Sequence, residues 1–445
     1  MAIRLARRLG PADAALIVMG GIIGSGIFRN PSVVAKELHT TPLILIAWCI
    51  GGVFALLGAF LFAELAARRP ADGGLYAYIR DAFHPVVAFA YGWTLLLVSQ
   101  SGGMASAAVT LGAYVTPLSG LHLDERLVGA VLIVVLTAIN CLGVRTGTTT
   151  QNVFMIAKIA ALAGLVVVGL FAPNAAHAAQ HVQDTLTRSP ALLGMMGLAL
   201  VPVFFSYSGW QTASFMTGEL KDPARALPRA MIYGVIGVVA LYLAVTVIDL
   251  RVLGEGGLAA TTTPSSDVAR AVFGPLGERL VALLIALSTL GFLSNQVLVS
   301  PRVYFQMAED RTFFPFLAWL HPRTLVPIAA IAVQGVVTLF IVFLGSYDQI
   351  LNYVTAVDDV FFGLAAVALF VFRARDAGKG VEAGFRMPGH PVTTALFGLT
   401  AWAIVLNLFV RSPGDSLIGL GILVAAVPIY YLFKGFLHAD RRHRR

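Results

Sequence analysis

Two clusters of glycine and serine interrupt apolar stretches of this chain. The first is GGIIGSGIF at residues 20–28, and the second is FSYSGW at residues 205–210. Lipid cannot satisfy the backbone N–H and C=O groups that a helix break frees, so irregular backbone at membrane depth is tolerated where it lines a cavity. Paired breaks in two halves of a membrane protein are the best sequence indication of the binding site of a secondary transporter. The two clusters therefore predict such a site.

Three ionisable residues lie inside other apolar stretches: Lys158, Asp358 and Asp359. A lysine near the centre of a membrane helix costs about 2.5–3.5 kcal/mol on insertion scales, so Lys158 should face the protein interior and have partners there. The alternative is that its flexible stem carries the ammonium to the membrane surface. Successive helical residues point about 100° apart, so the two aspartates are not expected to share one direction. One is expected to face the pocket and titrate while the other bonds a neighbouring helix; a purely structural role stays open.

The composition indicates that membrane helices position these residues. Of the 445 residues, 58% are hydrophobic and 12% are charged, against roughly 25% charged in soluble domains. The mean hydropathy is +0.82. About 20 apolar residues span a bilayer as a helix. The chain is predicted to have twelve spans, at residues 11–38, 42–67, 83–115, 127–144, 149–172, 190–218, 229–250, 276–308, 325–346, 349–373, 390–411 and 415–435. The longest external connection is expected at 251–275.

The basic residues predict the orientation in the membrane. Most of the 31 Lys and Arg residues, including the RRHRR tail at 441–445, fall on one side if the amino terminus is cytoplasmic. This bias follows the positive-inside rule and places both termini in the cytoplasm. The net charge of +8 is therefore assigned to topology and not to nucleic acid. We expect a multi-pass protein of a plasma (inner) membrane of a bacterium, with the lipid bilayer as its surroundings.

The positions of the two breaks predict an internal repeat. The breaks lie in the first and sixth spans, so equivalent positions are five spans apart. Because five is an odd number, the second half enters the membrane from the opposite side. We expect an all-α polytopic membrane protein with a 5+5 inverted repeat, residues 11–172 and 190–373, and two additional helices at 390–435. No nucleophilic triad or phosphate-binding loop is present in the sequence, so neither an enzyme nor a cofactor or metal ion is expected.

Several motifs form a set that covers most of the chain. They are GSGIF at 24–28, FAEL at 62–65, AYGW at 90–93, GELKDP at 218–223 and PRVY at 301–304. Together they resemble amino-acid transporters of the amino acid–polyamine–organocation (APC) superfamily, and the bacterial L-amino-acid-transporter-like branch most closely. The resemblance implies the leucine-transporter fold, alternating access, and an amino acid bound between the first and sixth spans, with contributions from the third, eighth and tenth.

A broken helix suits a zwitterion because its new start exposes N–H groups and its preceding end exposes C=O groups. We assign the carboxylate to the amides around Ser25, Gly26 and Ile27, helped by the Ser25 hydroxyl. The ammonium is expected to meet the carbonyls of Ile22, Phe205 and Ser208. The alternative is that the glycines only allow close helix packing.

The resemblance also implies roles for single side chains. Phe205 resembles the aromatic gate of the family, and Trp210 and Gln211 are weaker pocket candidates. Family members carry a lysine at the position of Lys158, where sodium-coupled relatives hold a cation. Lys158 is then expected to bridge the first span, at the carbonyl of Gly20 or Ile23, to the eighth, at Ser288 or Thr289. The Asp358–Asp359 pair departs from the family, which usually shows one polar residue followed by Trp.

These features predict a sodium-independent amino-acid transporter, with neutral L-amino acids favoured. It works either as an exchanger, with Lys158 permanently charged, or as a proton-coupled symporter, with Lys158 able to release its proton. The alternatives are a transporter of cationic amino acids or polyamines, and an amino-acid sensor or receptor on a transporter fold. No disulfide-linked heavy chain is expected, because the loop at 116–126 has no cysteine.

Overall fold

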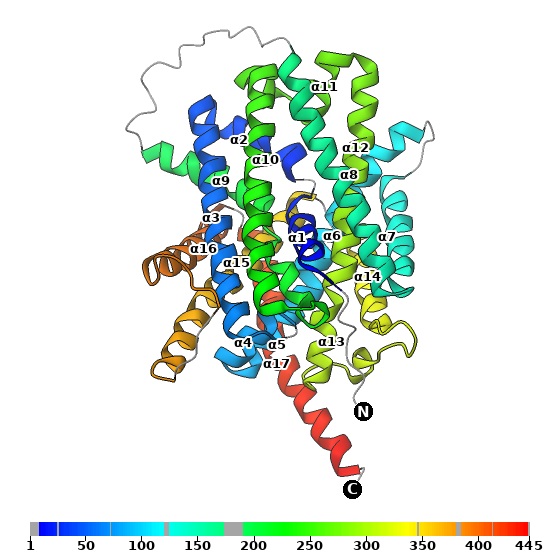
Figure 1. Ribbon diagram of the computed structural model, residues 1–445, viewed down its shortest axis with the longest axis vertical. Helices are drawn as coiled ribbons and strands as arrows, with labels where there is room; N and C mark the ends of the chain where they lie inside the picture. The colour runs from blue at the N-terminus through cyan, green and yellow to red at the C-terminus, as the bar shows by residue number, and fades with distance from the viewer. Residues whose placement is uncertain are drawn as a thin grey trace.

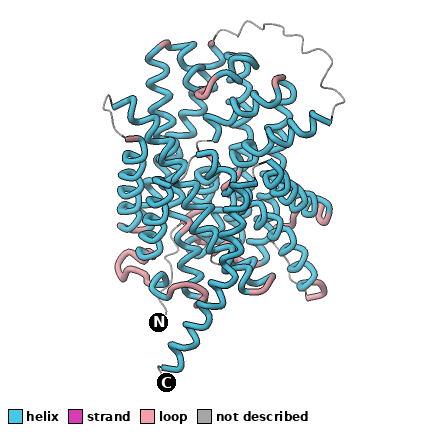
Figure 2. Tube along the Cα trace, turned by 180° about the vertical axis from the view of Figure 1, so that it is seen from behind, coloured by secondary structure: helices cyan, strands magenta, loops and turns pink. Residues whose placement is uncertain are grey.

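The computed structural model describes residues 9–24, 26–71, 73–119, 124–172, 190–344, 347–379, 384–411 and 413–443. The described chain is helical throughout, with short connections (Figure 2). The α-helices are α1 Pro11–Ile22, α2 Gly26–Leu38, α3 Thr41–Arg68, α4 Leu75–Ala82, α5 Pro85–Thr94, α6 Gln100–Ser119, α7 Glu125–Cys141, α8 Val144–Phe171, α9 Pro190–Tyr207, α10 Pro223–Ala260, α11 Pro264–Phe273, α12 Pro275–Val299, α13 Pro301–Glu309, α14 Ile328–Leu344, α15 Tyr347–Asp376, α16 Val392–Arg411 and α17 Pro413–His443. A π-helix, η1 Leu95–Ser99, joins α5 to α6, and two 3-10 helices are η2 Trp210–Glu219 and η3 Pro315–Ala318.

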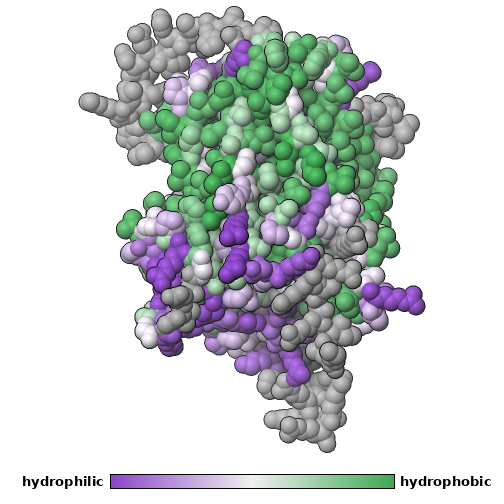
Figure 3. Space-filling model, viewed as in Figure 1, coloured by the Kyte–Doolittle hydropathy of each residue, from purple (hydrophilic) through white to green (hydrophobic). Residues whose placement is uncertain are grey.

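The outer surface of the helix bundle is apolar, as expected for a protein that spans a membrane. Among the described residues, eight helices are long and apolar enough to cross a bilayer, and the bent pair α1–α2 makes a ninth span; α14 is a shorter apolar helix. Large apolar side chains point outward, with Val131 55%, Phe340 67% and Leu406 68% exposed. The space-filling view shows a broad hydrophobic zone and, below it, a hydrophilic end around α4, α5 and α13, called the polar end from here on (Figures 1 and 3).

The first predicted break is present between α1 and α2. Pro11 occupies the first turn of α1, and Asp13 Oδ2 accepts the Gly10 N–H at 2.8 Å. The helix stops at Ile22, and α2 begins at Gly26 with its axis bent by 41°. Ser25 lies outside the described residues. The break separates a half-helix on the polar-end side, α1, from one on the opposite side, α2 (Figure 1).

The second predicted break follows α9. That helix ends at Tyr207, and the chain resumes as the 3-10 helix η2 at Trp210. Gly209 connects the two with φ +112°, a left-handed conformation that costs glycine least because glycine has no Cβ. The break therefore falls where the FSYSGW cluster predicts it.

The segment expected as the longest external loop is largely helical. Helix α10 continues to Ala260 through a kink at Gly254, which has φ 69°, and α11 follows directly. Side chains beyond the kink hold this extension: Glu255 Oε1 accepts the N–H of Thr41 at 2.6 Å, and the Ser32 hydroxyl donates to the carbonyl of Thr261. The Ser-, Thr- and Gly-rich composition indicated a loop, but these tertiary contacts stabilise helix instead.

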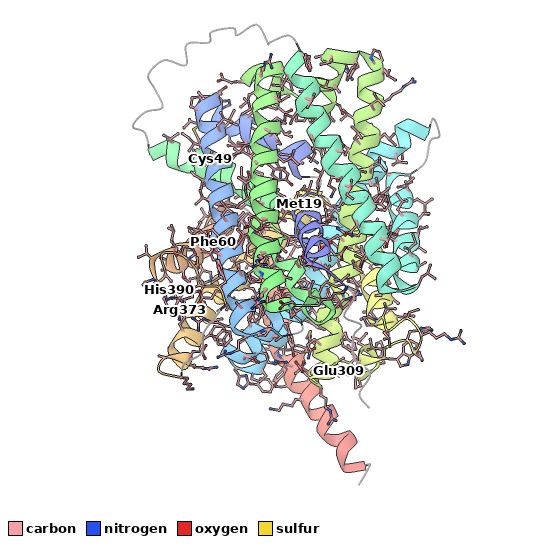
Figure 4. The ribbon with its side chains drawn as sticks, in the orientation of Figure 1. Met19, Cys49, Phe60, Glu309, Arg373 and His390 are labelled. Atoms are coloured by element: carbon pink, nitrogen blue, oxygen red, sulfur yellow. The ribbon has the colours of Figure 1, made fainter. Side chains whose placement is uncertain are left out.

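A buried carboxylate organises the polar end. Glu64, fully buried in the last turns of α3, accepts hydrogen bonds from Arg68 (2.7 Å), from Arg373 (2.9 and 2.6 Å) and from the N–H of Met387 (2.6 Å). Arg373, at the end of α15, and His390, just before α16, are labelled close together in Figure 4. Glu64 thus ties α3, α15 and the approach to α16 together, a structural task.

Candidate substrate site

A cavity lies where the two broken helices meet, and it encloses about 710 Å³ of space, part of it open to solvent. Five parts of the chain form its wall: the α1–α2 break, the α9–η2 break, the η1–α6 region, α12 and α15. Its lining residues are Gly21, Ile22, Gly24, Gly26, Ser99, Gln100, Gly103, Ser106, Ala107, Phe205, Ser206, Ser208, Gly209, Gln211, Phe292, Gln296, Val354, Thr355, Asp358 and Asp359. The five regions match the first, third, sixth, eighth and tenth predicted spans.

Small residues bring the two breaks into direct contact. A Cβ on Gly21 would lie 2.5 Å from the carbonyl oxygen of Gly209, and a Cβ on Gly26 would lie 3.1 Å from Cα of Ser206. The first separation is too short for a Cβ without movement of the backbone, and the second is tight enough that Ser206 would have to shift by a few tenths of an ångström. The glycines therefore pack the breaks against each other, and Gly21, Gly26 and Gly209 also line the cavity. Close packing and cavity formation, which the sequence offered as alternatives, occur together here.

The carbonyl groups at the end of α1 already have polar partners. The Tyr242 hydroxyl, from α10, donates to the carbonyl of Ile22 at 3.2 Å, and the Lys158 ammonium, from α8, donates to the carbonyl of Ile23. The carboxyl end of a helix carries partial negative charge, so a cation is stabilised there. The fully buried Lys158 thus compensates the partial negative charge at the end of α1, which lies inside the protein.

Lys158 points inward, as the cost of placing an ammonium in lipid predicts. Its position also shows which of the expected hydrogen-bond partners it binds. Of the two carbonyls considered in the first span, the hydrogen bond goes to Ile23. In α12, the Thr289 hydroxyl donates to the carbonyl of Ile285 at 2.8 Å, and the Ser288 hydroxyl has no partner among the described residues. Gly20 instead packs on Gln151, since a Cβ there would lie 2.7 Å from Gln151 Nε2.

Two further donors on α8 hold α1. Gln151 Nε2 donates to the carbonyl of Leu16 at 3.0 Å, and Asn152 Nδ2 donates to Asp13 at 2.8 Å. With Lys158, three side chains of one helix therefore bind α1 along its length. The sequence showed Gln151 and Asn152 as an ordinary polar helix start and gave no sign of this role.

Helix α2 is held by different neighbours. Asn30 Nδ2 donates to Ser206 Oγ at 2.7 Å and to the carbonyl of Pro202 at 2.9 Å, both on α9. Asn30 is 2% exposed, and the sequence reasoning missed it; its place two residues after GSGIF was the available signal. These side chains thus attach α1 to α8 and α2 to α9, while both half-helices also pack on α10.

The residues predicted around the second break divide into two groups. Phe205, Ser208 and Gln211 line the cavity, and Gln211 also accepts the N–H of Gly209 at 3.1 Å. Trp210 is 1% exposed and does not line the cavity. The centroid of its ring lies 4.9 Å from that of the Phe62 ring. Trp210 therefore serves helix packing, the alternative to a pocket role. Ile27 is fully buried in α2 and is likewise absent from the lining.

Both aspartates of the pair line the cavity, whereas the sequence suggested that only one would face it. Asp359 is 4% exposed and Asp358 is half-buried. The Ser99 side chain hydrogen-bonds to Asp358. Residues from Val354 to Asp359 of α15 line the cavity, so its wall follows this helix for more than one turn. The pair gives this wall its acidic character.

Polar residues of η1–α6 and α12 were not predicted individually. They are Ser99, Gln100, Ser106 and Gln296. The run SQSGG at 99–103 inside an apolar span was the available signal for the first two. Together the lining offers backbone amides and carbonyls from the two breaks and hydroxyl, amide and carboxylate groups from η1, α6, α12 and α15, a set suited to binding a small polar molecule.

The comparisons with known proteins agree with this geometry. The family model described as amino acid permease matches residues 9–433. The chain is 29% identical to the serine/threonine exchanger SteT of Bacillus subtilis (strain 168), over 97% of both chains. It is 28% identical to the large neutral amino acids transporter small subunit 2 of Mus musculus, over 99% of this chain and 83% of that one. It is 26% identical to the b(0,+)-type amino acid transporter 1 of Mus musculus, over 96% and 88%.

Three findings agree on the family: the motif set, the two helix breaks around one cavity, and the match of the family model over nearly the whole length. The chain belongs to the amino acid permease family of the APC superfamily, and it is a membrane transporter of amino acids and not an enzyme.

Proposed function

We propose that this protein is a sodium-independent secondary transporter that moves amino acids by alternating access. The observation that supports it best is the cavity formed by two broken helices, with the Lys158 ammonium bound at the end of α1. An ammonium there supplies the positive charge that a bound sodium ion would supply, so sodium is not needed. The relatives named as a serine/threonine exchanger and a large neutral amino acid transporter favour neutral L-amino acids as substrates.

In the proposed complex, the substrate carboxylate meets the amides at the start of α2, near Gly26. The ammonium meets carbonyls at the two helix ends. Those of Ile22 and Phe205 already accept one hydrogen bond each, from Tyr242 and from the N–H of Ser208. A carbonyl oxygen has two lone pairs, so each can accept a second bond. Ser25, assigned to the carboxylate from the sequence, lies outside the described residues.

The separate attachments of α1 and α2 fit alternating access. Helix α1 is bound to α8 through three side chains, and α2 is bound to α9 through Asn30. Both half-helices also pack on α10, so movement of either one during alternating access has to slide along that helix while the break between them stays at the substrate. The full scheme that we propose has twelve spans, a 5+5 inverted repeat, both termini cytoplasmic and a bacterial inner membrane. We also propose that no disulfide-linked heavy chain is attached.

The test is counterflow of radiolabelled amino acids in proteoliposomes, with sodium replaced by choline. Uptake should depend on internal substrate or on a proton gradient and should not respond to sodium. Binding without flux would instead identify a sensor or receptor.

The matched variants are Lys158→Met and Lys36→Met, since Lys36 is exposed on α2. Lys158→Met should lower uptake at least about tenfold, because a hydrogen bond from a charged group contributes about 1.5–3 kcal/mol. Lys36→Met should transport normally. Equal uptake by the two variants, or sodium stimulation of the unmodified protein, would contradict the proposed role of Lys158.

A second candidate substrate class is favoured by one observation. The two aspartates in the cavity wall could bind a second positive charge, which neutral amino acids lack. Cationic amino acids and polyamines carry that charge. Polyamines have no carboxylate for the amides of α2, so cationic amino acids fit both ends of the cavity better.

A further inference from the structure

The acidic wall of the cavity has no counter-charge nearby. No Lys, Arg or His is present among the described residues that line the cavity. None of the ion pairs found in the described part of the chain includes Asp358 or Asp359. The buried cation Lys158 is on α8, and its ammonium is bound to the carbonyl of Ile23 at the first break. The charge of the pair must therefore be balanced by something other than these side chains.

Two unsatisfied polar atoms in the cavity lining indicate that a ligand completes it. Gln296 Oε1 and Thr355 Oγ1 have no hydrogen-bond partner among the described residues. Both side chains line the cavity, and each residue is 5% exposed. Thr355 stands one helical turn before the two aspartates. A buried polar group without a partner is costly, so a donor from a bound molecule would stabilise this region.

The groups that face the pair leave its charge uncompensated. Asp358 interacts electrostatically with Tyr91 of α5 and with Asp359, and Tyr304 of α13 lies next to Tyr91. Tyrosines are neutral at ordinary pH. Other charged groups on the elements packed against α15 have partners of their own: Glu64 binds Arg68 and Arg373, Asp376 binds Arg68 and Arg69, Arg80 binds Asp81 and Asp310, and Asp415 binds Asn352. Lys434 of α17 lies over the Tyr430 ring, and Arg411 is at the exposed end of α16.

Two adjacent carboxylates in a low-dielectric site do not both stay ionised. The like charge of each disfavours ionisation of the other, and they titrate as a coupled pair. The pair therefore holds a proton unless a cation arrives. A proton and a substrate ammonium are then competing ways to balance the same charge.

We propose that Asp358 and Asp359 form the side-chain subsite of the cavity, where the second ammonium of a basic amino acid replaces a proton held by the pair. This inference rests on the proposed function. The step is balanced: the ammonium keeps its proton and ion-pairs with the carboxylate, and the proton of the carboxyl group leaves to water. A neutral amino acid binds with the proton still in place, so both substrates cross with the same total charge.

The rest of the cavity fits such a substrate. The amides of α2 and the acidic wall belong to different helices of the cavity lining, and the apolar lining residues Ala107, Phe292 and Val354 provide contact for a methylene stem. Gln296 Oε1 and Thr355 Oγ1 can accept the N–H groups of the ammonium that do not face a carboxylate. Lysine and ornithine have the required groups; arginine has a larger cationic end.

The direct test is proton release by the unmodified protein. Purified transporter in weakly buffered detergent solution, followed with a pH-sensitive dye, should release about one proton for each lysine bound and none for leucine. Lysine affinity should rise with pH, by at most about tenfold per pH unit for exchange with one proton. Lysine binding with no proton release and no pH dependence would overturn the inference.

The variants Asp358→Asn and Asp359→Asn locate the subsite. In proteoliposomes each should lower lysine uptake at least about tenfold, the loss of one charge-assisted contact, while leucine uptake persists and loses its pH dependence. Asp124→Asn, at the exposed start of α7, is the matched control and should behave as the unmodified protein. Normal lysine uptake by both cavity variants would place the subsite elsewhere.

Failure of this inference is distinguishable from failure of the proposed function. If leucine is transported but lysine neither crosses nor competes, the subsite is wrong and the transport function stands. If no amino acid is transported by the unmodified protein, the proposed function itself fails.

Discussion

The buried ion pair between Glu219 and Arg302 gives the sharpest test of how the polar end is held together. Arg302 Nε lies 2.8 Å from Glu219 Oε1, and the two side chains are 1% and 0% exposed. Arg302 also donates to the carbonyl of Leu298, and the backbone of Glu219 accepts the N–H of Leu9 at 3.0 Å. The pair thus joins the segment before α1, the end of η2 and the α12–α13 junction.

The perturbations are Arg302→Met, Glu219→Leu and the two combined. Glu219→Leu leaves the Arg302 charge buried without its ion-pair partner, which typically costs about 3–5 kcal/mol, and Arg302→Met removes this ion pair from the buried Glu219 carboxylate. The double variant removes both charges, and replacing a buried pair by apolar side chains is often neutral or stabilising. The double variant should therefore be more stable than either single variant. Arg302→Met should be the worse single change, since it also removes the donor to Leu298.

Asp310→Asn provides the control. Asp310 pairs with Arg80 at the same end of the molecule, but these side chains are 21% and 28% exposed. A solvent-exposed pair contributes about 0–1 kcal/mol. Asp310→Asn should therefore change the stability little.

The assay is the apparent melting temperature in detergent, by intrinsic fluorescence at one fixed scan rate, because membrane proteins often unfold irreversibly. Each single variant should melt several degrees below the unmodified protein, and the double variant should regain at least half of that loss. Additive losses in the double variant would show that the two charges do not stabilise each other. Single variants no worse than Asp310→Asn would refute the argument from burial.

Three further changes follow from the same geometry. Gly26→Val should abolish amino-acid binding, since its side chain would meet Ser206 across the two breaks, and calorimetry showing unchanged affinity would count against the site. Phe205→Ala should reduce transport more than equilibrium binding if the ring gates the cavity; wild-type flux with this variant would remove that role. Glu64→Gln should lower stability by about 2–3 kcal/mol through weakened charged hydrogen bonds, chiefly to Arg68 because Arg373 is 24% exposed. Substrate affinity should not change, and an altered affinity at unchanged melting temperature would contradict the structural assignment of Glu64.

The sequence alone determined the features that depend on local composition. Helix breaks at residues 20–28 and 205–210 were predictable because two glycine and serine clusters interrupt apolar stretches in corresponding positions of the two halves. Hydropathy indicated a membrane protein, and a set of motifs distributed over several spans indicated the family. The inward direction of Lys158 followed from the cost of placing an ammonium in lipid.

Other sequence predictions stay predictions. The twelve spans, the 5+5 repeat and the cytoplasmic termini rest on hydropathy and the distribution of basic residues. The choice between neutral and cationic substrates depends on how the acidic wall is neutralised, which uptake measurements decide.

Tertiary structure decided which residues meet at the cavity. Trp210 belongs to the same motif as Phe205, but its ring packs among aromatic side chains while Phe205 lines the cavity. The π-helix at Leu95–Ser99 adds a residue to one turn and so changes which face of α6 Gln100 and Ser106 occupy. Helices α10 and α11 continue through residues that look like a loop, because Glu255 and Ser32 bind across to neighbouring segments. Each of these outcomes depends on rotation about a helix axis or on contacts between distant segments, and local sequence encodes neither.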